Sequence, residues 1–296
     1  MRRTYREKIY KCGEYLEVQV FPVFKKGNTR RRGRSKPTSE MQARLNQKNA
    51  ERALTRIINK NFTEDDISLT LTFSDKYLPD TYEEAERLFK NFIRRLGYLR
   101  KKRGLPEMKY VKIPGPGRFH FHVPMTGGIP DKELQRLWPY GYANALHFAL
   151  DENGLEGHAR YIAKQFEDSG DIDIFSMFDI DELTGEVNEK SELGIRNSKL
   201  KRAKGQRRYS CSKNIVRPEP EEHDGRISAS RVEELATVDS SSRAAFEKMY
   251  PGYVFSSCRP YYNEDNGGYY LEIKMYKEDA SFLRNRKRFR KLEMKN

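Results

Sequence analysis

The chain has 296 residues, enough for one large domain or two small ones with a substantial hydrophobic core. It contains no run of about 18 apolar residues and no apolar segment after its first charged residues, so neither a membrane-spanning helix nor a secretory leader is expected. The 3 cysteines are far apart and odd in number. This excludes a disulfide framework or a Cys-x-x-Cys zinc site and indicates a cytoplasmic protein.

The charge of the chain is concentrated at one end. Lys and Arg number 57 against 43 Asp and Glu, a net charge of +14. Residues 1–60 hold 17 basic and 5 acidic side chains, which leaves a net charge of only +2 for the rest. A basic arm on a near-neutral body indicates a polyanion partner, most simply nucleic acid; a solvated basic tail is the alternative. The candidate DNA-binding residues are Arg30, Arg31, Arg32, Arg34 and, further along, Arg118.

After a basic loop at 26–37, the pattern predicts a helix at about 39–60 and then a strand at 67–73, where apolar and polar residues alternate without exception. Thr81, followed by Glu84 three residues later, predicts the start of an amphipathic helix that ends near Gly104. The next expected elements are a strand at 109–113, a strand at 118–123, a short helix at 130–137, a strand at 142–148 and a helix at 155–166.

Short connections between strands favour an antiparallel sheet flanked by helices, an α+β fold. Ten acidic residues and one basic residue lie within 167–192 and indicate an insertion or loop. Beyond it, helices are expected near 228–236 and 241–249, and strands near 253–262 and 268–276. The expected regions are a basic arm and helix (1–60), a core (61–166), an acidic insertion (167–206) and a C-terminal α+β extension (207–296).

His120 and His122 are the most specific chemical feature. Residues i and i+2 of a strand share a face, so both imidazoles project together and can hold one divalent metal ion, whereas Phe121 faces the core. Two surface histidines on a half-exposed strand are the alternative. Tyr161 and Lys164 share a helix face at spacing i, i+3, where an ammonium favours the phenolate of a nearby tyrosine. An ordinary amphipathic helix would show the same pair.

The histidine pair, the Tyr-x-x-Lys helix and the upstream Leu-Thr-Leu-Thr-Phe strand together resemble the three motifs of the HUH endonucleases. The wider chain looks like the rolling-circle replication initiators of bacterial phages and integrative mobile elements. The resemblance covers roughly residues 60–280. The stretches that carry it include ISLTLTF (67–73), GRFHFHVPMTGG (117–128), ENGLEGHARYIAKQ (152–165) and RRYSCSKNIVRP (207–218).

The resemblance implies an HUH core with a central antiparallel sheet, in a bacterial cytoplasmic enzyme that nicks and rejoins single-stranded DNA at a replication origin. Tyr161 would become joined to the 5′-phosphate, with Lys164 stabilising charge. His120 and His122 would hold Mn²⁺ or Mg²⁺. A host helicase or polymerase is a further implied partner, and no membrane is involved.

The chain departs from the family at one position. The family usually places an acidic metal ligand on the strand before the histidines, but residues 112–117 read Lys-Ile-Pro-Gly-Pro-Gly and contain no carboxylate. His158, three residues before Tyr161, is a candidate third ligand or a packing residue. Two other functions therefore remain open: a DNA-binding protein with weakened or lost cleavage, and an HUH transposase with the same chemistry.

The charge distribution predicts that residues 1–60 supply most of the non-specific affinity for DNA. Each phosphate contact adds a log–log salt slope of roughly −0.7 on single strands. Removing this segment is therefore expected to flatten the salt dependence of binding by several units, measured by fluorescence anisotropy over a salt series. An unchanged slope would mean that the basic residues serve another purpose.

Overall fold

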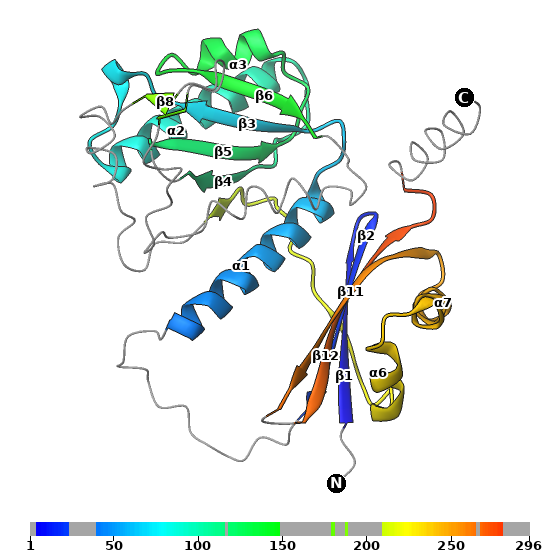
Figure 1. Ribbon diagram of the computed structural model, residues 1–296. Helices are drawn as coiled ribbons and strands as arrows, with labels where there is room; N and C mark the ends of the chain where they lie inside the picture. The colour runs from blue at the N-terminus through cyan, green and yellow to red at the C-terminus, as the bar shows by residue number, and fades with distance from the viewer. Residues whose placement is uncertain are drawn as a thin grey trace, which may run out of the picture.

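The computed structural model describes residues 4–23, 40–115, 118–148, 179–180, 187–188, 209–264 and 267–280. Within these ranges the chain is a mixed α+β protein with two five-stranded antiparallel sheets, one two-stranded ladder and five α-helices (Figure 1). The α+β class expected from the sequence is confirmed. No helix in the described part of the chain is long and apolar enough to cross a membrane.

The first sheet has the strand order β6-β3-β5-β4-β9, which places β5 at its centre. Its strands are β3 (Ile67–Thr72), β4 (Val111–Pro114), β5 (His120–Met125), β6 (Ala143–His147) and β9 (Ser210–Cys211). The alternation expected in β3 is present, because Leu69 and Leu71 are fully buried on one face. Thr70 and Thr72, which alternate with them, therefore lie on the opposite face.

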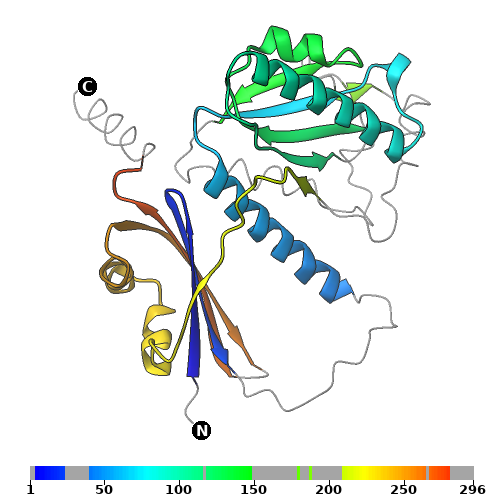
Figure 2. The same cartoon turned by 180° about the vertical axis from the view of Figure 1, so that it is seen from behind.

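Two helices, α2 and α3, cover the apolar face of this sheet (Figure 2). Their bounds are Tyr82–Lys102 and Asp131–Leu137. As the sequence predicts, Thr81 caps α2: its side chain accepts a hydrogen bond of 3.2 Å from the backbone N–H of Glu84. Phe89 and Phe92 of α2 pack with Trp138 in the core of this layer. The core therefore occupies one face of the sheet and leaves the other face for different contacts.

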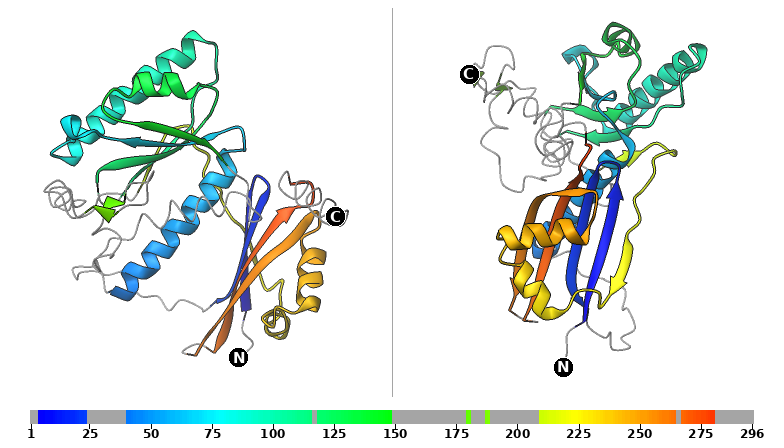
Figure 3. Two further views of the ribbon diagram at one scale, coloured as in Figure 1. Left: turned by 45° about the horizontal axis from the view of Figure 1, so that its top comes forward. Right: turned by 90° about the vertical axis from the view of Figure 1, so that its right-hand side faces the viewer.

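The second sheet, of order β10-β1-β2-β12-β11, unites the two ends of the chain. Its strands are β1 (Thr4–Cys12), β2 (Tyr15–Val23), β10 (Glu221–Asp224), β11 (Tyr253–Asn263) and β12 (Gly268–Lys277). Helices α6 (Ala229–Leu235) and α7 (Ser240–Met249) pack on one face (Figure 3). These helices and the β11–β12 hairpin lie where the sequence predicts them.

The N-terminal part of the chain is different from the expected basic arm, because β1 and β2 are central strands of the second sheet. Arg6 and Lys8 do not stand free. Arg6 pairs with Asp224 at 2.7 Å, and Lys8 pairs with Glu222 at 2.6 Å, both on the neighbouring strand β10. Composition cannot distinguish such paired charges from solvated ones, since the partners lie more than 200 residues away in the sequence.

Helix α1 (Glu40–Asn61) lies between the two sheets (Figures 1 and 2). One side of α1 is apolar and packs against the first sheet and the residue just after β6. The residues of this cluster include Leu54, Ile57 and Ile58 of α1 with Val111, Ile113 and Phe148. The other side of α1 is polar and faces the second sheet.

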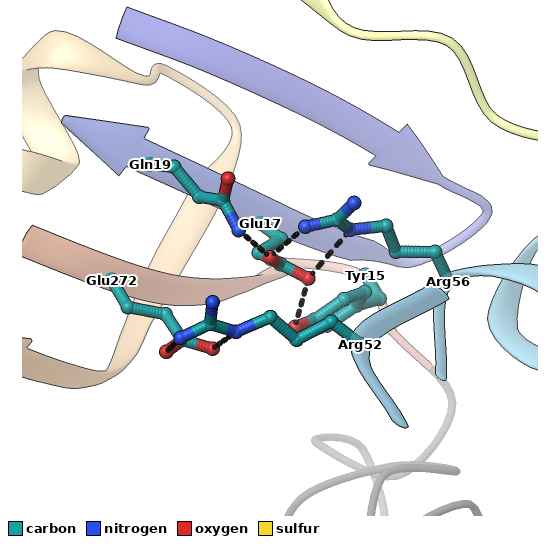
Figure 4. A network of polar contacts seen from close by, with 6 residues as sticks. All are labelled: Tyr15, Glu17, Gln19, Arg52, Arg56 and Glu272. Atoms are coloured by element: carbon teal, nitrogen blue, oxygen red, sulfur yellow. Dashed lines mark hydrogen bonds and ion pairs between the residues drawn. The ribbon is translucent and has the colours of Figure 1, made fainter. Parts of the chain in front are cut away.

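A buried carboxylate anchors this polar side of α1 (Figure 4). Glu17 of β2 is 1 % exposed and accepts hydrogen bonds from Arg56 of α1 at 2.5 and 3.0 Å. Gln19 and Tyr15 donate to the same carboxylate at 2.8 and 3.3 Å. Burial disfavours the charge of Arg56, but the hydrogen bonds and attraction from Glu17 outweigh this cost and raise its pKa. The guanidinium also lies 3.5 Å above the ring of Tyr10.

The described residues of the acidic region form a short ladder, β7 (Asp179–Ile180) with β8 (Val187–Asn188). The expected helix at 155–166 and the rest of 167–206 lie outside the described residues. The division of the chain into four regions therefore stays a prediction, apart from the N-terminal strands noted above.

The architecture changes how the salt-dependence prediction is tested. Deleting residues 1–60 would remove β1, β2 and α1 and so destroy both the second sheet and its contact with the first. The test is therefore substitution of Arg30, Arg31, Arg32 and Arg34 by Gln, with the same salt series. These arginines lie outside the described residues.

The Glu17–Arg56 pair predicts a large loss of stability in Arg56→Met, because a buried carboxylate would lose its charge partner. The free energy of unfolding is expected to fall by about 3–5 kcal/mol. The matched control is Lys11→Met, whose pair with Glu221 is more than half exposed on both sides. That substitution is expected to cost less than about 1 kcal/mol. Urea unfolding monitored by circular dichroism measures both; equal losses would contradict the role given to the buried pair.

Candidate functional site

The two histidines of β5 lie side by side on the face of the first sheet opposite α2. Their Nε2 atoms are 3.0 Å apart, and the ring planes are nearly perpendicular at 86°. Phe121, between them, is fully buried on the other face. The strand alternation thus brings both imidazoles to one point, as expected from the sequence.

Contacts at the other ring nitrogen fix the direction of each imidazole. Nδ1 of His120 is 2.7 Å from the backbone carbonyl of Arg118, which can only accept, so Nδ1 carries the proton and Nε2 has the lone pair. Nδ1 of His122 is 3.3 Å from the hydroxyl of Thr70, its partner across the β3–β5 ladder. Metal-binding histidines are typically oriented in this way through their second nitrogen.

The separation of the two Nε2 atoms is informative about coordination. Two nitrogen ligands about 2.1 Å from one metal ion are about 3.0 Å apart at an octahedral angle and about 3.4 Å apart at a tetrahedral one. The 3.0 Å distance is that of a hydrogen bond between the two rings, and it also equals the spacing of adjacent positions around an octahedral ion, which would take the place of the shared proton. Mn²⁺ and Mg²⁺ prefer this geometry, whereas structural zinc sites are tetrahedral.

Gly115 makes room for the His120 ring. A Cβ atom at position 115 would lie 2.0 Å from Nε2 of His120, far closer than atoms can approach. The backbone N–H of Gly115 also donates to the carbonyl of His120 at 2.9 Å. Gly115, directly after β4 in the segment where the sequence shows no acidic ligand, therefore has a structural role in seating the ring.

The strand that precedes the histidines offers no metal ligand on their face. Ile113 pairs with His122 but is fully buried against α1, and Pro114 pairs with Phe121. No group of three or more His, Cys, Asp or Glu suited to a metal ion exists within the described ranges. The imidazole pair thus fits part of an octahedral shell, and water or residues outside these ranges must supply the remaining ligands.

Lys112 is separated from the histidines by the sheet. It is 3 % exposed on the α2 side, where it pairs with Glu86 and lies 5.5 Å from the ring of Phe121. Burial lowers its pKa to about 8. The ammonium group of Lys112 therefore lies in the core beneath α2, on the face opposite the histidines.

Arg118 lies two residues before β5, next to the histidine pair. Its guanidinium donates to the carbonyl of Phe73 at 2.8 Å and to the carboxylate of Asp75 at 2.5 Å. These contacts hold the backbone carbonyl that orients His120. The contact of Arg118 with DNA stays a prediction. Its role in orienting His120 was not expected from the sequence.

Three further site residues expected from the sequence are not described by the structure. Tyr161, Lys164 and His158 lie outside the described residues, so their distance from His120 and His122 is not defined. Sequence reasoning did not identify Gly115 or the individual role of Thr70. The pairing of strand 67–73 with 120–125 is the feature that would have placed Thr70 beside His122. Nothing in the sequence alone indicates that Gly115 lies against the ring of His120.

Comparison with protein-family models, curated proteins and solved structures finds no match. The geometry of the site therefore carries the functional argument together with the motifs of the sequence.

The packing of His120 on Gly115 predicts that Gly115→Ala displaces the ring and weakens metal binding. A loss of at least about ten-fold in Mn²⁺ affinity is expected, as for other changes that misorient a ligand. Gly97→Ala, in helix α2, is the matched control, because a Cβ at position 97 would lie in ordinary contact with the side chain of Met108 at 3.8 Å. Isothermal titration with Mn²⁺ measures both variants; unchanged affinity in Gly115→Ala would contradict the proposed seating.

Proposed function

We propose that the protein is a metal-dependent endonuclease and strand transferase that nicks single-stranded DNA through a tyrosine-linked intermediate, as in rolling-circle replication initiation. The observation that carries this proposal is the convergence of His120 and His122 at 3.0 Å on the central strand, each ring oriented through Nδ1. Two unrelated surface histidines would not need to bring their Nε2 atoms together. They would also not need a glycine at position 115 to leave room for a ring.

The roles of the other residues follow from the resemblance to the HUH endonucleases. The phenol oxygen of Tyr161 forms a bond to the scissile phosphorus, and the bond from phosphorus to the 3′ oxygen breaks. The phenolic proton passes overall to that leaving oxygen, which becomes the 3′-hydroxyl. The ammonium of Lys164 favours the phenolate and stabilises developing negative charge. The phosphotyrosine link keeps the bond energy for later rejoining.

His120 and His122 would hold the metal ion, which when bound supplies Lewis-acid polarisation of the phosphate. Two nitrogen ligands favour Mn²⁺ over Mg²⁺, because imidazole suits transition metals better than the harder Mg²⁺. Activity is accordingly assigned to Mn²⁺, with weaker support from Mg²⁺.

A second function, DNA binding without efficient cleavage, is favoured by one observation. The position that pairs with His122 on β4 is the buried Ile113 rather than a carboxylate. A two-histidine site binds a hard cation weakly, so such a protein would hold an origin or repress its element. A transposase with the same site chemistry would behave like the first proposal in a cleavage assay.

The nucleophile assignment predicts that Tyr161→Phe abolishes the covalent protein–DNA adduct, because the phenol oxygen is lost, while DNA binding changes by less than about two-fold. A denaturing gel of the full chain with Mn²⁺ and labelled single-stranded DNA shows the adduct. Tyr98→Phe, at an exposed site on α2, is the matched control and should keep it. An adduct that persists in Tyr161→Phe would point to another tyrosine, such as Tyr140 or Tyr142.

The strand register predicts a gain of Mg²⁺-supported cleavage in Ile113→Glu, because that side chain lies on the face of His122. Pro114→Glu is the control, since its side chain lies on the opposite face with Phe121. Initial nicking rates of both variants are measured in Mg²⁺ and in Mn²⁺. Thermal melting of each variant measures the stability that is lost when a carboxylate is buried. A gain in the Pro114 variant alone would contradict the assigned faces.

A further inference from the structure

We infer that the exposed side of β6 and the residue just before it, formed by Tyr142, Asn144 and Leu146, is a binding strip for single-stranded DNA, with the ring of Tyr142 stacking on a base. The inference rests on the proposed function, because it supplies the base contacts beside the phosphate site of that proposal. We call these three residues the β6 strip.

The strand register places the β6 strip on the face of the histidines. Thr70 pairs with His122 on one side and with Asn144 on the other, so these three side chains form one row across the sheet. Thr72 pairs with His120 and receives and donates hydrogen bonds with the backbone of Tyr142. Two strand spacings separate Tyr142 from His120, roughly 10 Å.

The strip is more exposed than the β4 side of this face. The side of β4 is buried beneath α1, but Tyr142 is 63 % exposed and Leu146 is 59 % exposed. Asn144, between them, is also exposed and carries an amide. An exposed aromatic ring, an amide and an aliphatic side chain in line on a strand are suited to bases and not to phosphates alone.

The backbone beneath Tyr142 is held rigidly. Gln135 of α3 donates to the carbonyl of Gly141 at 2.8 Å and accepts from the N–H of Ala143 at 2.9 Å. A Cβ at Gly141 would lie 2.3 Å from the carbonyl oxygen of Thr72, so the chain passes there in close contact. The exposed ring is therefore presented from a fixed strand end, which lowers the entropy cost of stacking.

Single-stranded DNA is the occupant that this arrangement favours. Stacking requires an unpaired base, which a duplex does not offer, and a base contact beside the histidine pair leaves the phosphate directed to it. Arg118, two residues before β5, lies at the same end of the sheet, where its charge is paired with Asp75 at 2.5 Å.

The test is binding of the full chain, without metal, to a fluorescein-labelled 20-nucleotide oligothymidylate by anisotropy. Tyr142→Ala is expected to weaken binding about ten-fold, and Tyr142→Phe, which keeps the ring, by less than about two-fold. Tyr98→Ala is the matched control: this tyrosine is 72 % exposed but lies on α2, beyond the opposite face of the sheet. It should bind like the parent protein.

A second probe measures stacking itself. An oligonucleotide with one 2-aminopurine at successive positions should lose fluorescence on binding at one position, and Tyr142→Ala should remove that quenching. Equal affinity of Tyr142→Ala and parent, or an equal loss on a duplex, would overturn the inference. So would a loss of the covalent adduct in Tyr142→Phe, which would make this residue a nucleophile.

The outcomes separate the strip from the proposed function. Loss of single-strand affinity in Tyr142→Ala, with no adduct from the parent protein in Mn²⁺, would support the strip and overturn nicking. A parent adduct with unaltered affinity in Tyr142→Ala would support nicking and overturn the strip.

Discussion

The position of α1 between the two sheets depends on a buried ion pair, Glu17 with Arg56. Each carboxylate oxygen of Glu17 accepts two hydrogen bonds, so a charge that is 1 % exposed is fully satisfied. Removing two charges from water is costly, and only such complete pairing makes the contact tolerable. The gain is geometric: the bidentate guanidinium sets the rotation of α1 and thereby decides which residues face the first sheet.

The orientation of α1 affects the histidine site through strand β4. The apolar side of α1 buries Ile113, and Ile113 pairs with His122 in the ladder. One side of the histidine face is thus closed by packing, whereas the β6 side remains exposed. Within the described residues, the fold therefore combines a fixed pair of imidazoles with one exposed flank.

Local patterns in the sequence predicted most of the elements. Strict alternation in 67–73, the Thr81 cap and the apolar spacing of α2 are properties of neighbouring residues, and they were found in the structure. The shared face of His120 and His122 follows from the same period of two. The strands β1 and β2 were missed, because their charged residues are neutralised by β10, a strand that the sequence brings no nearer than about 200 residues.

The sequence by itself determined the α+β class, the order of the elements from β3 to β6, and the pairing of two imidazoles on one strand face. It could do so because periodicity and capping act over a few residues. Only the tertiary structure decided that the chain ends close into a second sheet, that Gly115 seats a histidine ring, and that Thr70 joins Asn144 to His122 in one row. Those relations arise from strand register and helix packing, which depend on contacts between distant residues and leave no local pattern.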